Sequence, residues 1–327
     1  MSAEQSTADA PAATRRTELD DLEAIQKFQD EQNAARPWIG PREPIASLED
    51  EFRNGSQAFV RKARWLARRF ASLHRTRGDG DCFYRSLAFQ LVYALLHSND
   101  PQLCQRVQSH LSRGIDILEQ VGYDRSVTED FWEPLRDLLS RLPGCTPTVQ
   151  TAPPLNDDLL VAAFNDPEIT NATVVFLRLA LSAWLKVGGG PARGLNADKF
   201  SVFLFALDSS AGTGEPPTMD EFCSQEVEPV GKEADHLQIA ALCDFLHISL
   251  DVAYFSRSDP AFAALDNDDN NKPPVASAED VLPVDIVEFR IEKEASERLP
   301  GAEGPLGFVH VGTLLYRPGH YDVLLAQ

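Results

Sequence analysis

The feature that most constrains this chain is a glycine- and aspartate-rich turn that runs directly into an apolar segment. It spans residues 77–87, Arg-Gly-Asp-Gly-Asp-Cys-Phe-Tyr-Arg-Ser-Leu. After Cys82, an apolar residue recurs at every fourth position, which predicts one buried stripe of an α-helix. The stripe consists of Phe83, Leu87, Leu91 and Leu95. The helix therefore begins at or next to the Cys82 thiol.

The turn before Cys82 suits a reactive thiol. Gly80 can adopt backbone angles that are closed to other residues, and Asp79 or Asp81 can cap the free N–H groups of the helix. Exposed amides and the helix dipole would stabilise a thiolate, and also the oxyanion that forms when it attacks a carbonyl. A buried, inert cysteine at a helix start is the alternative interpretation, so a base is needed to decide.

A candidate base lies near the C-terminus, in His320-Tyr321-Asp322 between two predicted strands. Residues two apart on a strand point to the same face, so His320 and Asp322 can project together. The carboxylate would then hold the imidazole tautomer, and the other ring nitrogen would face a nucleophile. Alone, such a pair is more often a surface pair. Together with Cys82, it supplies a nucleophile, a base and an orienting carboxylate.

The apolar patterning predicts a chain that is helical first and sheet-forming last, an α+β order. The basic segment 52–77 is expected to form an amphipathic helix with its charges in water. The helix expected at 173–185 carries Arg178 and is too short and interrupted to span a membrane. The other expected helices lie at 101–141, 159–164, from 219, and at 236–246, and the strands at 248–254, 285–291, 308–316 and 321–325.

The N-terminal region is expected to be separate from the folded domain. Residues 1–16 have the composition of a disordered tail and resemble neither a signal peptide nor an anchor. Residues 17–44 are expected to form a helical arm and linker, because apolar residues recur every third position from Leu19 to Phe28. The arm either folds on a partner or packs on the same domain. The domain itself is placed at 45–327, after a proline-rich break.

Composition excludes several classes of function. Thirty basic against 50 acidic residues, a formal net charge of -20, disfavour binding to nucleic acid or to an anionic membrane. Five cysteines without a Cys-x-x-Cys pair indicate neither a disulfide framework nor a zinc site. We therefore expect no metal, and no cofactor, because the glycines at 188–190 lack a phosphate-binding signature. A reducing compartment is expected, the cytoplasm and also the nucleus.

Three ordered blocks resemble the ovarian-tumour (OTU) cysteine proteases, and most closely their otubain branch. Two are the catalytic blocks, Asp-Gly-Asp-Cys-Phe-Tyr-Arg at 79–85 and Tyr-Arg-Pro-Gly-His-Tyr-Asp at 316–322. The third is Phe-Cys-Ser-Gln-Glu-Val-Glu-Pro at 222–229, followed by Lys-Glu-Ala-Asp-His at 232–236. The resemblance implies a papain-like OTU cysteine peptidase fold, with a helical subdomain packed on a small C-terminal antiparallel sheet.

The same resemblance implies a deubiquitinase that hydrolyses isopeptide bonds to ubiquitin and prefers lysine-48-linked chains. Cys82 would be the nucleophile, His320 the general base and acid, and Asp322 the orienting group. Asp79 and the amides around Cys82 would shape the oxyanion site. The implied partners are ubiquitin, polyubiquitin chains and ubiquitin-conjugating enzymes, with the chain a monomer. A non-catalytic binder of ubiquitin or of ubiquitin-loaded conjugating enzymes remains the alternative.

Two positions depart from the otubain pattern: Gly78 replaces a usual proline and Asp81 a usual asparagine. An extra carboxylate beside Cys82 disfavours the thiolate by like-charge repulsion, so lower activity or a displaced pH optimum is expected. The loops at 188–196 and 258–283 are longer than in the family.

Other polar residues are interpreted as structural. His236 is expected to be held by local hydrogen bonds at a helix start, and Glu226 and Glu228 to lie on a solvated face. The remaining cysteines are expected to serve packing: Cys104, Cys145, Cys223 and Cys243.

Overall fold

The computed structural model describes residues 35–98, 100–143, 145, 152–187, 218–256, 281–289 and 309–326. The predicted tail at 1–16, the arm from Thr17 to Phe28, the loop at 188–196 and most of the loop at 258–283 lie outside these residues. The compact unit that carries the sheet begins at Pro37.

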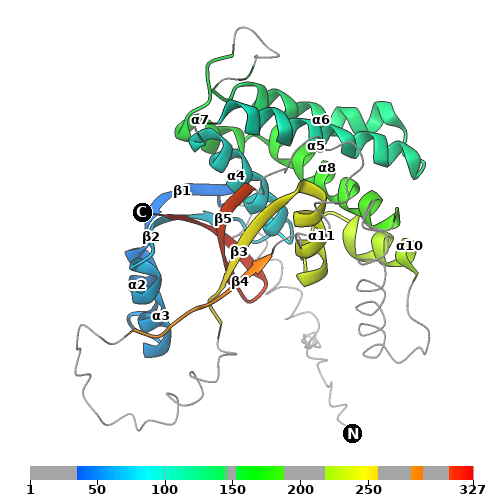
Figure 1. Ribbon diagram of the computed structural model, residues 1–327. Coiled ribbons are helices and arrows are strands. Elements are labelled where there is room, and N and C mark those ends of the chain that lie inside the picture. The colour runs from blue at the N-terminus through cyan, green and yellow to red at the C-terminus, as the bar shows by residue number, and fades with distance from the viewer. Residues whose placement is uncertain are drawn as a thin grey trace, which may run out of the picture. The chain divides into compact units, whose positions relative to one another are not determined.

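A six-stranded mixed sheet runs through this unit (Figure 1). The strands are β1 (Ile39–Pro44), β2 (Phe70–Thr76), β3 (Ile248–Tyr254), β4 (Asp285–Phe289), β5 (Val309–Arg317) and β6 (His320–Ala326). Their order across the sheet is β1-β2-β6-β5-β3-β4. Strands β3 and β5 are parallel, and the other neighbours are antiparallel. The first and last parts of the chain therefore meet at the β2–β6 pair.

Helices pack on both faces of the sheet. The helical elements are α2 (Ala46–Phe52), α3 (Gln57–Ala67), α4 (Cys82–His97), α5 (Pro101–Gln120), α6 (Arg125–Ser140), α7 (Asp157–Ala163), α8 (Pro167–Lys186), α10 (Met219–Phe222), the π-helix η2 (Cys223–Val227) and α11 (His236–Leu246). Alternation along β6 separates two cores. Val323 and Leu325 join the large core with α4, α5, α6, α8 and α11, whereas Leu324 joins the smaller core with α2 and α3.

The α+β class is confirmed, but the sheet differs from the expected C-terminal antiparallel one. Two strands precede Cys82 in the chain, and one neighbouring pair is parallel. Strand β2 escaped notice because it is buried on both faces, so it lacks the alternation that marks a half-exposed strand. Strand β1 contains Pro41 and Pro44, which an edge strand tolerates because its outer N–H groups have no partner strand.

The single amphipathic helix expected at 52–77 is wrong. The structure has α3 at Gln57–Ala67 and then strand β2. One of the charges expected in water is also buried, since Lys62 Nζ donates to the Ser256 carbonyl oxygen at 2.9 Å. Phe70 and Leu73 continue the helical spacing of α3, which is why the pattern alone did not reveal the break.

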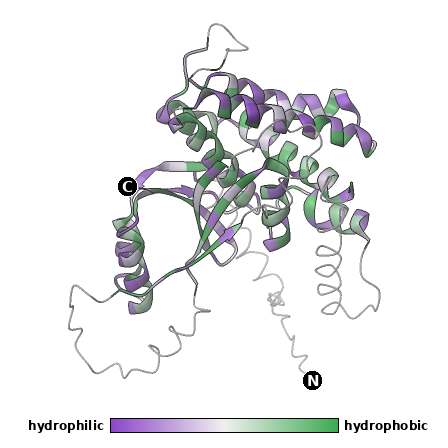
Figure 2. Ribbon diagram, in the orientation of Figure 1, coloured by the Kyte–Doolittle hydropathy of each residue, from purple (hydrophilic) through white to green (hydrophobic). Residues whose placement is uncertain are grey.

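Helices α4 and α8 form the interior of the large core. The predicted α4 stripe of Phe83, Leu87, Leu91 and Leu95 is confirmed as buried. Helix α8 has 20 residues, longer than predicted, and passes the length and composition criteria for a membrane span. However, 67% of its apolar window is buried inside the protein. Figure 2 shows the apolar colour concentrated in α4, α8 and α11, which fits a core helix rather than a span.

A polar contact seats α4 on the sheet beyond its first turns. Gln90 Nε2 donates to the Val311 carbonyl oxygen of β5 at 2.7 Å. The neighbouring Gly312 has a φ of 125°, and a Cβ there would lie 2.0 Å from Gln90 Nε2. The close approach of α4 to β5 therefore depends on a residue without a side chain at position 312.

We expect Gly312→Ala to lower the free energy of unfolding by about 2–4 kcal/mol, since it adds backbone strain and displaces the buried Gln90 amide from its acceptor. Gly122→Ala is the matched control, because Gly122 also has a positive φ, 95°, but has open space around it. Urea unfolding of both variants measures the difference. Equal losses would contradict the role assigned to the Gln90 contact.

Candidate active site

Cys82 is the first residue of α4 and is 2% exposed. It lines a cavity of about 340 Å³. The other lining residues come from β3, β5, β6, the β5–β6 turn, the segment before α11 and its first residue: Tyr254, Tyr316, Tyr321, Gly319, Glu233, Ala234, Asp235 and His236. The thiol therefore opens into a cleft with an aromatic wall, formed by Tyr254, Tyr316 and Tyr321, and an acidic wall, formed by Glu233 and Asp235.

His320 and Asp322 lie together, as predicted for residues two apart on a strand. The His320 Nε2 atom is 2.8 Å from Asp322 Oδ1, which fixes Nε2 as the donor to the carboxylate. The other ring nitrogen, Nδ1, is buried and has no hydrogen-bond partner among the described residues. A Cβ on Gly78 would lie 3.4 Å from it, so the glycine leaves room on this side of the ring.

The pKa of His320 is raised to about 9. Burial alone would lower it, but the hydrogen bond and charge of Asp322 and the neighbouring Cys82 thiol favour the protonated ring. The Cys82 thiol therefore lies close enough to the His320 ring to raise its pKa, although Nδ1 has no hydrogen-bond partner among the described residues. Cys82, His320 and Asp322 are thus brought into one site from distant parts of the chain.

Asp322 is fully buried and strongly supported. Its Oδ1 accepts from the Thr76 backbone N–H at 2.9 Å, and its Oδ2 from Arg317 Nη2 at 2.7 Å. Burial would raise the pKa of Asp322, but the bond from His320 and the charge of Arg317 hold it below its ordinary value. The orienting carboxylate therefore stays ionised beside the imidazole.

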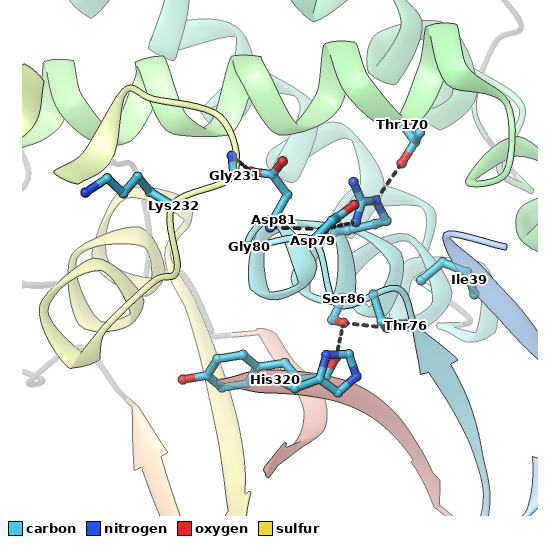
Figure 3. Close-up of polar contacts among 12 residues, drawn as sticks. Ile39, Thr76, Asp79, Gly80, Asp81, Ser86, Thr170, Gly231, Lys232 and His320 are labelled. Atoms are coloured by element: carbon cyan, nitrogen blue, oxygen red, sulfur yellow. Dashed lines mark hydrogen bonds and ion pairs between the residues drawn. The ribbon is translucent and has the colours of Figure 1, made fainter. Parts of the chain in front are cut away.

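Two polar residues of α4 bond to the sheet, Ser86 to the strand of His320 and Gln90 to the neighbouring strand β5. Ser86, one turn after Cys82, lies 2.8 Å from Thr76 Oγ1 and donates to the Tyr321 carbonyl oxygen at 3.1 Å. Figure 3 shows Ser86 between Thr76 and the strand that begins at His320. Cys82, Ser86 and Gln90 recur at every fourth position along α4. That spacing was a readable signal in the sequence, and our reasoning missed it.

The two aspartates of the turn do not cap α4 as expected. Asp79 Oδ1 accepts from the Asp81 N–H at 3.1 Å and from Arg85 Nη1 at 2.9 Å. Asp81 receives Arg178 Nε at 2.9 Å and the Gly231 N–H at 3.0 Å. The N-terminus of α4 has no side-chain cap, so its amides point toward the cleft end of the helix without a competing carboxylate.

Asp81 is therefore not an uncompensated charge beside Cys82. Its carboxylate forms a buried ion pair with Arg178, whose side chain has no exposed surface. The pairing offsets the repulsion that we expected between Asp81 and a thiolate. A lone arginine in an apolar helix indicates from the sequence that a buried counterion exists, but not which carboxylate supplies it.

The residues interpreted as structural divide into two groups. His236 follows the helix cap Asp235 and lines the cleft, with its ring packed on Phe289. The solvated-face interpretation is wrong for Glu228, which accepts from Tyr123 Oη at 2.7 Å and Lys186 Nζ at 2.7 Å. Burial would raise the pKa of Glu228, but these partners lower it.

The other cysteines differ from Cys82 in their surroundings. Cys104, Cys223 and Cys243 are buried, and burial raises the pKa of each thiol, that of Cys223 to about 11. Cys145 is half-buried. Packing roles for the three buried thiols are thus in agreement with the structure.

One group of described residues has the spacing of metal ligands. Asp251, Glu288 and His310 place ligand atoms within 4.8 Å of one another on β3, β4 and β5. None of the three lines the cleft at Cys82.

A thiol at a helix N-terminus, facing an imidazole that a carboxylate orients on a neighbouring sheet, defines a papain-like cysteine peptidase. Comparison with known proteins identifies the branch. The family model described as Peptidase C65 Otubain matches residues 31–326. An ovarian tumour domain-containing deubiquitinating enzyme of Arabidopsis thaliana is 30% identical over 93% of this chain and 85% of that protein. The chain belongs to the otubain family and is a deubiquitinase of the cysteine type.

Other relatives agree with this assignment. The ubiquitin thioesterase OTUB1 of Homo sapiens is 28% identical over 91% of this chain and 86% of that protein. The fold matches a solved complex of OTUB1 with ubiquitin aldehyde and UBCH5B~Ub, with a TM-score of 0.64 and 23% identity. That match covers 94% of this chain and 99% of the solved chain.

The raised pKa of His320 makes stability depend on pH. The folded state holds the proton more tightly than an unfolded chain with the ordinary pKa of 6.5, so the stabilisation is full below pH 6.5 and is lost as the pH rises through about 9. We expect the free energy of unfolding of wild type to exceed that of His320→Gln by a margin that is about 3 kcal/mol larger at pH 6 than at pH 10. Urea unfolding across this range measures it. A difference that does not change with pH would contradict the assigned environment.

Proposed function

We propose that Cys82, His320 and Asp322 hydrolyse isopeptide bonds between ubiquitin and lysine side chains, with a preference for lysine-48-linked chains. The observation that carries the proposal is the relation of the three side chains. Asp322 accepts a hydrogen bond from Nε2 of His320, and the buried Nδ1, which has no other partner among the described residues, is available to the thiol at the start of α4. Family membership supports the substrate class.

The chemistry follows from this arrangement. His320 Nδ1 takes the thiol proton, and the Cys82 sulfur attacks the carbonyl carbon of the scissile bond. The imidazolium then gives the proton to the leaving lysine amine, and a thioester to Cys82 remains. Water, activated by the now neutral imidazole, hydrolyses the thioester and restores the thiol. Asp322 stabilises the imidazolium in both halves of the cycle.

The oxyanion of each tetrahedral intermediate needs hydrogen-bond donors. The first amides of α4 are available for this purpose, because no side chain caps that end of the helix. Asp79 shapes this region indirectly by accepting from the Asp81 N–H, which holds the turn in place. The buried Arg85 in turn anchors Asp79.

The cleft suits an extended substrate segment. Tyr254, Tyr316 and Tyr321 offer flat apolar surfaces, and Glu233 and Asp235 offer negative charge, which favours a segment with basic side chains. The solved relatives include complexes of OTUB1 with ubiquitin aldehyde and with UBC13~Ub or UBCH5B~Ub. Ubiquitin, polyubiquitin and ubiquitin-loaded conjugating enzymes are accordingly the partners that we propose for this chain.

The test is cleavage of a panel of di-ubiquitins, one for each linkage, by wild type and Cys82→Ala. Wild type is expected to cleave the lysine-48-linked dimer fastest, and Cys82→Ala to lose turnover because the nucleophile is absent. A ubiquitin probe with a C-terminal electrophile should label wild type only.

Cys145→Ala is the matched control, since it removes a half-buried thiol outside the cleft and should keep both cleavage and labelling. Equal cleavage of all linkages would refute the lysine-48 preference alone. Binding of ubiquitin without cleavage or labelling would contradict the proposed hydrolysis and favour the alternative function, a non-catalytic binder of ubiquitin.

A further inference from the structure

A single buried arginine connects the two sides of the cleft. Arg178 lies in the middle of α8, has no exposed side-chain surface and does not line the cavity at Cys82. Its guanidinium packs over the Tyr84 ring at 4.2 Å, on the first turn of α4. A group so placed contacts no substrate, so any effect on the reaction acts through other residues.

On one side, Arg178 holds the turn that precedes the nucleophile. Its Nε donates to Asp81 Oδ1 at 2.9 Å, and its Nη2 to the Gly80 carbonyl oxygen at 3.3 Å. Asp81 is the residue directly before Cys82, and its own N–H is held by Asp79. The backbone that delivers the thiol is therefore tied to α8.

On the other side, Arg178 holds the segment that leads to the acidic wall. Its Nη1 donates to the Val227 carbonyl oxygen at 2.9 Å, at the end of η2, and its Nη2 donates to the Lys232 carbonyl oxygen. Lys232 directly precedes Glu233, which lines the cleft. One planar guanidinium thus binds both the turn before Cys82 and the segment that leads to the acidic wall, through its fixed fork of donors.

The turn before Cys82 and the segment that leads to the acidic wall also contact each other, at Gly80 and Gly231. The Gly231 N–H donates to Asp81 Oδ1 at 3.0 Å, a contact that Figure 3 shows between the two labelled residues. Gly80 has a φ of 79°, and a Cβ there would lie 1.9 Å from the Gly231 carbonyl oxygen. The backbone at Gly80 therefore packs directly on the backbone at Gly231. Arg178 bonds to the Gly80 carbonyl oxygen and Asp81 to the Gly231 N–H, so both side chains support this contact.

We propose that Arg178, through its buried pair with Asp81, is a positioning residue that sets the spacing between the Cys82 turn and the Lys232–Asp235 wall. The inference rests on the proposed function and deepens it. The pair also uses the departure at position 81: the carboxylate accepts from Arg178 and from Gly231 at once. Because Arg178 does not touch substrate, its loss lowers kcat and leaves KM nearly unchanged.

The experiment compares Arg178→Lys, Arg178→Gln, Asp81→Asn and the double variant Asp81→Asn/Arg178→Gln in di-ubiquitin cleavage. Lysine keeps the charge but cannot reproduce the fork, so kcat should fall roughly 10- to 100-fold. Asp81→Asn keeps an acceptor oxygen but leaves the buried Arg178 guanidinium without its counterion, so kcat should fall here too. Arg136→Gln, a surface arginine on α6, is the control and should match wild type.

The double variant separates positioning from charge balance. It removes both buried charges, so its unfolding midpoint should exceed that of Arg178→Gln, which leaves Asp81 without its cation. Its kcat should nevertheless remain as low as that of Arg178→Lys. Wild-type kcat in the double variant or in Arg178→Lys would overturn the proposal, as would a rise in KM with kcat unchanged.

A second readout keeps this test independent of the substrate assignment. The rate at which iodoacetamide alkylates Cys82, followed by mass spectrometry, reports the thiol and its base without ubiquitin. Slower alkylation in Arg178→Lys, in Asp81→Asn and in the double variant, with Arg136→Gln near wild type, supports the positioning role even if wild type cleaves no di-ubiquitin. Equal alkylation rates in all variants would overturn it.

Discussion

The packing of α4 against the sheet is the interaction on which the active site depends. Cys82 is carried by the helix and His320 by strand β6, and the bond from Ser86 to the Tyr321 carbonyl oxygen joins residues 235 positions apart. The contact from Gln90 to β5 continues the same stripe two turns after Cys82. Because these acceptors are backbone atoms of the strands, the register of the helix on the sheet determines where the thiol meets the imidazole.

Arginines pair with the carboxylates around Cys82 and His320; Arg85 and Arg178 are buried and Arg317 is half-buried. Three aspartates surround the nucleophile and the base, and each is held by an arginine: Asp79 by Arg85, Asp81 by Arg178, and Asp322 by Arg317. In a chain with a formal net charge of -20, unpaired carboxylates at this depth would be costly. Pairing with arginine keeps these aspartate side chains oriented, although the protein as a whole is strongly acidic.

Local patterns predicted the parts of the fold that repeat along the chain. The stripe after Cys82, the strand that holds His320 and Asp322 on one face, and the strands at β3 and β5 all follow short-range periodicity. Strands β1 and β2 did not, because one contains two prolines and the other is buried on both faces. The partners of Asp81 and Glu228 were also missed, since they lie on helices far away in the sequence.

The sequence by itself determined the chemistry: which residue can be the nucleophile, which the base, and which family the three blocks resemble. Those predictions follow from residue type and near-neighbour spacing, and the family assignment is confirmed. Only the tertiary structure decided that Asp81 is paired rather than repulsive, that the amides of α4 lack a side-chain cap, and that Arg178 joins the Cys82 turn to the segment before the acidic wall. These outcomes depend on contacts between elements distant in the chain, and no local pattern encodes such contacts.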